Sequence, residues 1–226
     1  MMEQPQDRQL AVTLAGILVA LVGVLVALFK DTFLRWWRRP ILEIRAACEP
    51  PHCHKTHWGQ HGAVYYLRLW IENTGRSAAE SVEVFVSDMR RQSDDGGFRL
   101  VPAFMPMNLR WSHATPPQIF YPRIAPGMGR HCDLGHIVNP TMRSQAGPGE
   151  DLPGADPTGT ILSLDLEVQP HTLTHLLQAG VYEFDVYAGA ANAKPVKARV
   201  QLRLTGQWYD DEHTMLTEGV RFGRVW

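Results

Sequence analysis

The most prominent hydrophobic segment of the chain is an uncharged apolar run over residues 10–29. An α-helix rises ~1.5 Å per residue, so about 20 apolar residues cross the ~30 Å hydrocarbon core of a bilayer. A cleaved signal peptide would have a positive n-region and a shorter apolar core. Residues 1–9 instead carry more acidic than basic side chains. The sequence therefore predicts a short N-terminal tail over 1–9, followed by an uncleaved transmembrane helix over 10–29.

The segment after this helix, residues 30–40, is basic and contains two tryptophans. Its candidate membrane-interface residues are Lys30, Arg35, Trp36, Trp37, Arg38 and Arg39. Cationic residues beside a membrane helix favour the cytoplasmic side, Trp favours the membrane–water interface, and Arg or Lys attracts anionic headgroups. We expect a single-pass protein of a bacterial inner membrane, with its N-terminus outside, its C-terminal domain cytoplasmic and the lipid bilayer as one partner. Packing of both tryptophans beneath the domain is the alternative.

Small residues recur along the predicted membrane helix. Gly16, Ala20, Gly23 and Ala27 are spaced so that they share one helix face. Small residues on one face let two membrane helices approach closely, which predicts a homodimer seam. Gly and Ala are also common in membrane helices that do not pair, so both interpretations remain open.

Beyond residue 40 the hydrophobic pattern changes to period two, which is typical of half-buried strands. In the segment 64–72, Leu67, Leu69 and Ile71 fall on one face, whereas Trp70 falls on the other. The predicted strands are 41–46, 64–72, 81–87, 98–101, 108–111, 161–168, 180–187 and 197–204. Short strands separated by Gly- and Pro-containing turns predict a mainly β domain over 41–226, an antiparallel immunoglobulin-like β-sandwich.

Three other segments of this domain lack a clear strand pattern. Residues 170–177 are expected to form one or two helical turns, and the acidic residues that begin 210–216 are placed to start a short helix. Residues 144–159 are rich in Gly and Pro without periodicity, so they are expected to form a mobile surface insertion.

Three short motifs suggest a family. Asn73, Gly75, Ala78 and Val82 form a strand–turn–strand pattern, residues 124–127 read Ile-Ala-Pro-Gly, and residues 180–184 read Gly-Val-Tyr-Glu-Phe. Together they resemble the bacterial immunoglobulin-like domains of the CARDB or NEW3 type. The resemblance implies a β-sandwich used for binding or spacing, with no catalytic residues to carry over. The long regions 88–122 and 138–160 depart from a minimal domain of that kind.

Composition narrows the range of partners. The net charge is −1, so the chain offers no broad electrostatic attraction for nucleic acid. The count of three cysteines is odd, whereas an exported domain more often has an even set. Free thiols therefore agree with a reducing cytoplasm.

The densest group of candidate metal ligands lies in residues 48–61. Cys48, His52, Cys53 and His54, together with the distant His131, could supply thiolate and imidazole ligands to Zn²⁺. The spacing matches no standard zinc finger, and neighbouring residues of an extended segment point to opposite sides. A solvated loop without metal, and therefore no cofactor, is the alternative interpretation.

Two further features bear on function. Asp133 and His136 could act as an acid–base pair, although a turn stabilised by the Asp133 carboxylate is the commoner arrangement. Trp70 lies on the polar face of its strand, which predicts either a partner-binding surface or a second layer that covers it. Neither feature is a motif of a known enzyme reaction.

The sequence as a whole predicts a membrane-anchored β-sandwich that acts as a protein-interaction or scaffolding module. Its partner would be another membrane-associated protein, because the chain between residues 29 and 41 is short. Three alternatives remain open: a metal-binding sensor or metalloenzyme using the Cys- and His-rich segment, an exported envelope-binding domain, and a membrane-perturbing effector. The presence of any enzymatic activity is left undecided.

Overall fold

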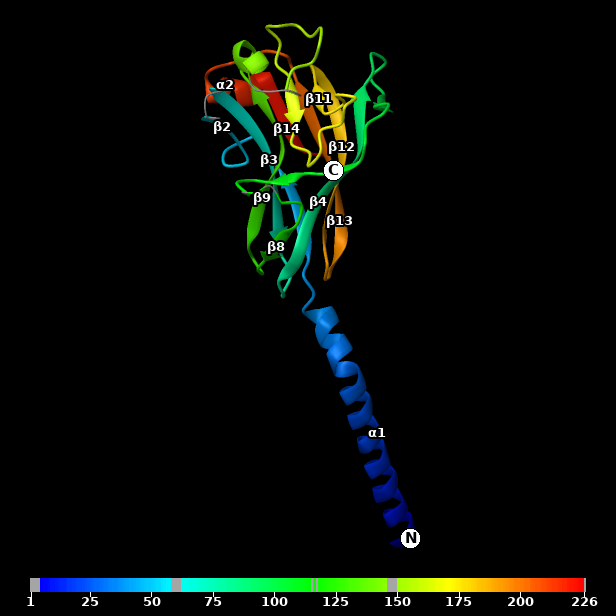
Figure 1. Cartoon of the computed structure of the whole chain (residues 1–226). Helices are drawn as coiled ribbons and strands as arrows, with labels where there is room; N and C mark the ends of the chain where they lie inside the picture. Colours follow the sequence, from blue (N-terminus) through cyan, green and yellow to red (C-terminus); the bar gives the residue numbers. More distant parts are fainter. Residues whose placement is uncertain (1–4, 58–61, 115, 117, 146–149, 226) are drawn as a thin grey trace. The chain divides into compact units, whose positions relative to one another are not determined.

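The protein is described by a computed structural model that covers residues 5–57, 62–114, 116, 118–145 and 150–225. The chain divides into two compact units, Met1–Arg39 and Pro40–Trp226. The first unit holds one N-terminal apolar helix, and the second is a mainly β domain with two antiparallel sheets (Figure 1).

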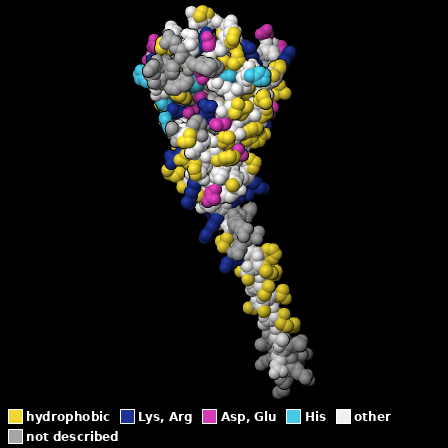
Figure 2. Space-filling model, viewed as in Figure 1, with side chains coloured by type: hydrophobic (Ala, Val, Ile, Leu, Met, Phe, Trp, Pro, Cys, Tyr) yellow, Lys and Arg dark blue, Asp and Glu magenta, His cyan; other side chains and the backbone are white. Residues whose placement is uncertain are grey.

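Helix α1 spans Pro5–Trp37 and is therefore longer than the predicted membrane segment. Its stretch Thr13–Lys30 is long and apolar enough to span a membrane. The described side chains of this stretch are exposed, and Figure 2 shows hydrophobic groups along it. The predicted linker 30–40 is helical as far as Trp37, because neither Pro nor Gly interrupts the chain before Pro40.

The strands of the second unit form two sheets, which we name sheet A and sheet B. Sheet A contains β1 (Leu42–Ala46), β2 (Cys53–His57), β3 (Ala63–Asn73), β7 (Arg110–Trp111), β9 (Gly129–Val138), β10 (Leu162–Leu164) and β11 (Leu176–Leu177). Sheet B contains β4 (Ala79–Gln92), β5 (Phe98–Leu100), β6 (Met107–Asn108), β8 (Tyr121–Ile124), β12 (Gly180–Ala190), β13 (Ala193–Leu204) and β14 (Val220–Val225). The strand order is β1-β3-β9-β10-β11 in sheet A and β14-β13-β12-β4-β5 in sheet B.

Three short helical segments complete the second unit. They are the 3₁₀ helix Pro140–Gln145, helix α2 (Glu212–Thr214) and the π-helical turn Met215–Gly219. Helix α2 lies within the predicted helix 210–216. Its N-cap is Asp211, whose carboxylate accepts a hydrogen bond from the backbone N–H of Thr214 at 2.9 Å.

The strands with clear alternation form as predicted, and most of them are longer than expected. Three segments differ from the prediction. The predicted strand 108–111 is divided into β6 in sheet B and β7 in sheet A. The alternating run 161–168 is a strand only at Leu162–Leu164, and Val168 is exposed rather than buried. The expected helix at 170–177 is wrong, because this segment forms turns and the short strand β11. Strands β2, β8, β9, β11 and β14 were not among the predicted elements.

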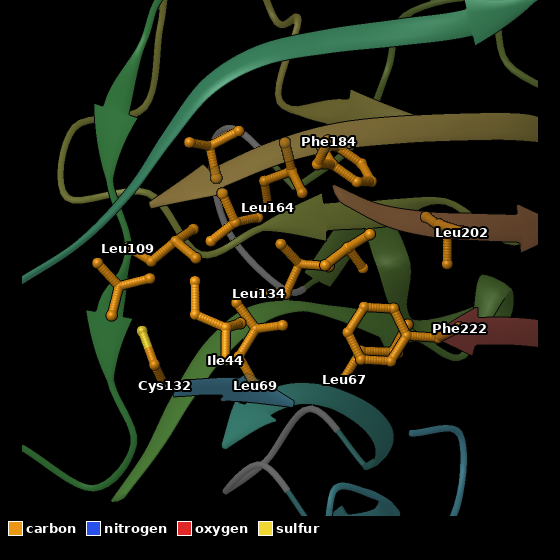
Figure 3. Close-up of a cluster of buried hydrophobic side chains, with 14 of the residues drawn as sticks. Ile44, Leu67, Leu69, Leu109, Cys132, Leu134, Leu164, Phe184, Leu202 and Phe222 are labelled. Atoms are coloured by element: carbon orange, nitrogen blue, oxygen red, sulfur yellow. The ribbon is translucent and has the colours of Figure 1, made fainter. Parts of the chain in front are cut away.

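The two sheets share one hydrophobic core. Leu67 and Leu69 of β3 enter it from sheet A, and Phe184 of β12 and Leu202 of β13 enter it from sheet B (Figure 3). An isolated bridge between Ala47 and Gly223 links the β1 end of sheet A to the edge strand β14 of sheet B. Except at Val168, the predicted inward positions are thus buried in this shared core.

A β-bulge in β9 determines what the outer face of sheet A presents. Leu67 pairs with Gly135 and Arg68 pairs with Asp133, so Leu134 is an extra residue on β9. Leu134 is buried in the core. In regular alternation Asp133 and His136 would point to opposite faces. Because of the bulge, Asp133 lies opposite Arg68 and His136 lies opposite Tyr66, so both point to the outer face of sheet A.

The region expected to form a mobile insertion, 144–159, is only partly described, because residues 146–149 lie outside the described part. Arg143 is 5% exposed and holds the rest in place. Its guanidinium donates to the Asp151 carboxylate at 2.6 Å and to the carbonyl oxygens of Gly159 at 2.5 Å and Asp156 at 3.1 Å. Arg143 therefore connects residues 151–159 to the domain, and Glu150 is connected separately through His136.

Candidate functional site

Trp70 lies half-buried on the outer face of sheet A. Its cross-strand neighbours are Arg45 on β1 and His131 on β9. The indole lies against Gly129, where a Cβ atom would be 2.3 Å from Trp70 Cε2. Only glycine leaves room for the ring at this distance, so the position of the indole is determined by packing.

Two histidines lie beside this tryptophan. His52 Nδ1 is 3.2 Å from His131 Nε2, and the centroids of the His131 and Trp70 rings are 4.8 Å apart. Burial lowers the pKa of His52, and burial together with repulsion between the protonated forms of the two rings lowers the pKa of His131 to about 4. Both imidazoles are therefore uncharged at neutral pH. We call His52, Trp70 and His131 the aromatic cluster.

A set of charged side chains lies next to the aromatic cluster on the outer face of sheet A. Arg68 is 6% exposed, and its Nε donates to Asp133 Oδ1 at 2.9 Å. Ser112 Oγ donates to the same oxygen at 2.5 Å, and Arg68 Nη1 lies 3.3 Å from His54 Nε2. Burial and the nearby charge of Asp165 raise the pKa of Asp133. Arg68 and Ser112 keep this carboxylate in one position.

His136 lies between two carboxylates. Its Nδ1 is 3.0 Å from Asp165 Oδ1, and its Nε2 is 3.2 Å from Glu150 Oε2. Burial alone would lower the pKa of His136, but Asp165 and Glu150 outweigh burial and raise it to about 10. His136 is therefore an imidazolium at neutral pH. We call Arg68, Ser112, Asp133, His136, Glu150 and Asp165 the charged network.

A cavity of about 230 Å³ opens onto this network. It is lined by aromatic and charged side chains, including Tyr66, Arg110, Trp111, Asp133, His136 and Asp165. Asp165 Oδ2 is buried and has no hydrogen-bond partner among the described residues. An unpaired acceptor at the wall of a cavity favours a donor from outside.

The groups of the charged network are largely buried and are paired with one another. A general base at neutral pH needs a free lone pair, and both ring nitrogens of His136 face carboxylates. In the described contacts Asp133 pairs with Arg68 and Ser112, and His136 pairs with Asp165 and Glu150, rather than with each other. Asp133 lies within strand β9 and not in the turn that was the commoner alternative. His136 is therefore not a poised proton acceptor at neutral pH, whereas Asp165 keeps one buried carboxylate oxygen without a hydrogen-bond partner among the described residues.

The candidate metal ligands fall into separate places. Cys53 is buried, and its thiol donates to the Ala47 carbonyl at 3.3 Å, whereas the Cys48 thiol contacts the carbonyl oxygens of Leu216 and Val220 at 3.5 Å. The histidines lie on the outer face of sheet A. Among the described residues, no three His, Cys, Asp or Glu side chains form a metal-binding group. The structure brings these candidates together in two separate pairs, Cys48 with Cys53, whose thiols are hydrogen-bonded, and His52 with His131.

The candidate membrane residues lie in or just after helix α1. Lys30 and Trp37 are exposed, as are Arg38 and Arg39 beyond the helix end, and the side chains of Arg35 and Trp36 lie outside the described residues. The seam residues Gly16, Ala20, Gly23 and Ala27 are exposed, and a Cβ at either glycine would meet nothing within 4 Å. This face is thus open to close approach by another helix.

Sequence reasoning missed most of the charged network. Glu150 lies in the expected insertion, where no regular contact could be predicted. Asp165 lies at an outward position of the alternating run 161–168, where a polar residue is ordinary. Arg68 was read only as a polar position on a strand. The bulge that aligns Asp133 with His136 has no signal in the pattern, although Gly135 marks its position: a Cβ there would lie 2.4 Å from the Ser163 carbonyl.

No protein-family model matches this chain, and no curated protein shows a significant match to it.

Proposed function

We propose that this chain is a single-pass membrane protein whose β-sandwich binds a membrane-associated partner protein through the outer face of sheet A. The aromatic cluster is the observation that carries the proposal. A half-buried tryptophan held by close packing against glycine, beside two uncharged histidines, has the composition of an interface centre.

The outer face of sheet B carries a group of paired charges around Asp185. There Asp185 accepts hydrogen bonds from Arg90 at 2.9 Å, Lys197 at 3.1 Å and Arg199 at 3.0 Å. Charged groups already paired with each other gain little from a partner, and charged residues are depleted at interface cores. Sheet A also carries paired charges in the charged network, so the choice of sheet A rests on the aromatic cluster beside them.

The membrane part of the proposal rests on helix α1 and the basic segment after it. The apolar stretch Thr13–Lys30 suits a bilayer span, and the positive side chains that follow favour a cytoplasmic domain of a bacterial inner-membrane protein. The two antiparallel sheets and the motifs at 73–82 and 180–184 support an immunoglobulin-like assignment. The small-residue face of α1 supports a homodimer within the membrane.

Site-specific photo-crosslinking in intact membranes tests the partner proposal. A photoreactive amino acid at Arg45, which neighbours Trp70 across the strands, should give one discrete adduct. The same amino acid at Arg203, an exposed position of β13, should give none.

Two variants make the crosslinking result decisive. Trp70→Ala should abolish the Arg45 adduct, whereas Phe120→Ala, which removes an aromatic side chain 52% exposed elsewhere, should leave it unchanged. An adduct that survives Trp70→Ala, or equal adducts at Arg45 and Arg203, would refute the proposal.

A further inference from the structure

We propose that His52 and His131 together form a binding site for a divalent transition-metal ion of the zinc type. Two neutral imidazole nitrogens that face one another are a donor pair suited to such ions. This inference does not depend on the partner-binding proposal, because it concerns the free protein.

The separation of the two nitrogens fits one shared metal ion. Zinc–nitrogen bonds measure about 2.0–2.1 Å, so two ligands of a tetrahedral ion lie about 3.3 Å apart. His52 Nδ1 and His131 Nε2 are 3.2 Å apart. An ion can therefore bind without a change in the spacing of the two rings.

The backbone holds both histidines in place before any ion binds. His131 lies within β9, paired with Trp70 of β3. The amide of His52 donates to the Glu49 carbonyl at 2.9 Å, and its own carbonyl accepts from the amide of Arg68 at 3.0 Å. A preformed pair loses little conformational entropy on binding, which favours affinity.

Charges of both signs lie around the pair. The charges of Arg45 and Arg68 disfavour a cation at the pair, and each is partly offset by a carboxylate: Arg45 by Glu72 at 2.8 Å and Arg68 by Asp133 at 2.9 Å. Glu49 adds a negative charge near His52.

Binding needs no net proton release from the neutral pair. In the metal-free state one nitrogen donates its hydrogen to the other. When an ion takes the place of that hydrogen bond, each imidazole carries its hydrogen on its second ring nitrogen. Two protein ligands leave the remaining coordination positions to water.

Calorimetric titration of the full chain in detergent micelles with ZnCl₂ tests the site. All proteins carry Cys48→Ser, so that the half-buried thiol does not contribute. We expect the parent to bind about one equivalent of zinc. His52→Gln and His131→Gln should each reduce the zinc affinity about tenfold or more, because loss of even a residue that only hydrogen-bonds to a metal ligand typically reduces metal affinity about 10–100-fold. His54→Gln, on the same face but beside Arg68, and the exposed His171→Gln should bind as the parent does.

Fluorescence provides a second readout in chains that keep both histidines. Cu²⁺ bound to the pair should quench Trp70, whose ring centroid is 4.8 Å from that of His131. Trp70→Phe should therefore reduce the quenched amplitude without changing the midpoint. Absence of zinc binding at millimolar concentration, parent-like binding in both Gln variants, or unchanged quenching in Trp70→Phe would each overturn the proposal.

Discussion

Replacing His136 with Gln tests whether the charged network stabilises the fold as an ionic unit. The pKa of this histidine rises from 6.5 to about 10 in the folded chain, and each pKa unit corresponds to ~1.36 kcal/mol, so the full coupling is roughly 5 kcal/mol. Gln169 also contacts Glu150, at 3.4 Å, and so keeps one carboxylate partly satisfied. We therefore expect His136→Gln to lower the free energy of unfolding by about 2–4 kcal/mol at pH 6.

The same substitution should change how stability depends on pH. Because the pKa of His136 is raised on folding, its contribution is complete below about pH 6.5 and is lost as the pH rises towards 10. Between these values the folded chain holds one proton more than the unfolded chain. The parent protein should therefore lose about 1.4 kcal/mol per pH unit from this group, and His136→Gln should lack that slope.

Urea unfolding of the full chain in detergent micelles, followed by tryptophan fluorescence at pH 6, 7, 8 and 9, measures both quantities. His171→Gln is the matched control, because His171 is exposed and outside the network. Equal slopes in the parent and His136→Gln would refute the reasoning. A loss in His136→Gln no larger than in the control would do the same.

Three further predictions concern packing, acid stability and thiol access. Gly129→Ala should destabilise the fold by about 1–3 kcal/mol, because the new methyl group meets the Trp70 ring. This destabilisation should largely vanish in a Trp70→Ala background, which urea unfolding of the four proteins in the double-mutant cycle measures. Asp185→Asn should cost about 3 kcal/mol at pH 7, measured by the same unfolding. Because Arg90, Lys197 and Arg199 outweigh burial and lower the pKa of Asp185, the parent should lose that stability as the pH falls below about 4, and the variant should not. Cys53 and Cys132 are fully buried, and burial raises the pKa of the Cys132 thiol. Maleimide should therefore modify both thiols only at the rate at which the protein unfolds, and mass spectrometry over time measures that rate.

The predicted strand faces follow from local alternation, which is why Leu67, Leu69 and Ile71 are buried as expected. Alternation failed where neighbouring structure altered the environment. Strand β9 carries a bulge and is flanked by β3 on one side and by β7 and β10 on the other, so its pattern is not a regular period of two. The helix expected at 170–177 failed because a short apolar pair, Leu176–Leu177, pairs with β10 instead.

Less of the candidate site than of the fold could be predicted from the sequence. The His52–His131 contact joins residues far apart in sequence, and nothing local indicates which of the histidines near position 52 meets His131. The prediction for Trp70 depended only on strand alternation, so its outward position was foreseeable. Its packing on Gly129 was not, because this contact depends on the register of β3 against β9.

The most direct test of the membrane-anchored account is the topology of the full chain in bacterial spheroplasts. Single exposed cysteines would be introduced as Gln9→Cys, before the apolar stretch, and Asp94→Cys, in the β4–β5 turn, both with Cys48→Ser. The account predicts that a membrane-impermeant maleimide labels the Gln9→Cys chain in intact spheroplasts. It should label the Asp94→Cys chain only after permeabilisation. Labelling of the Asp94→Cys chain in intact spheroplasts would contradict the cytoplasmic placement of the domain.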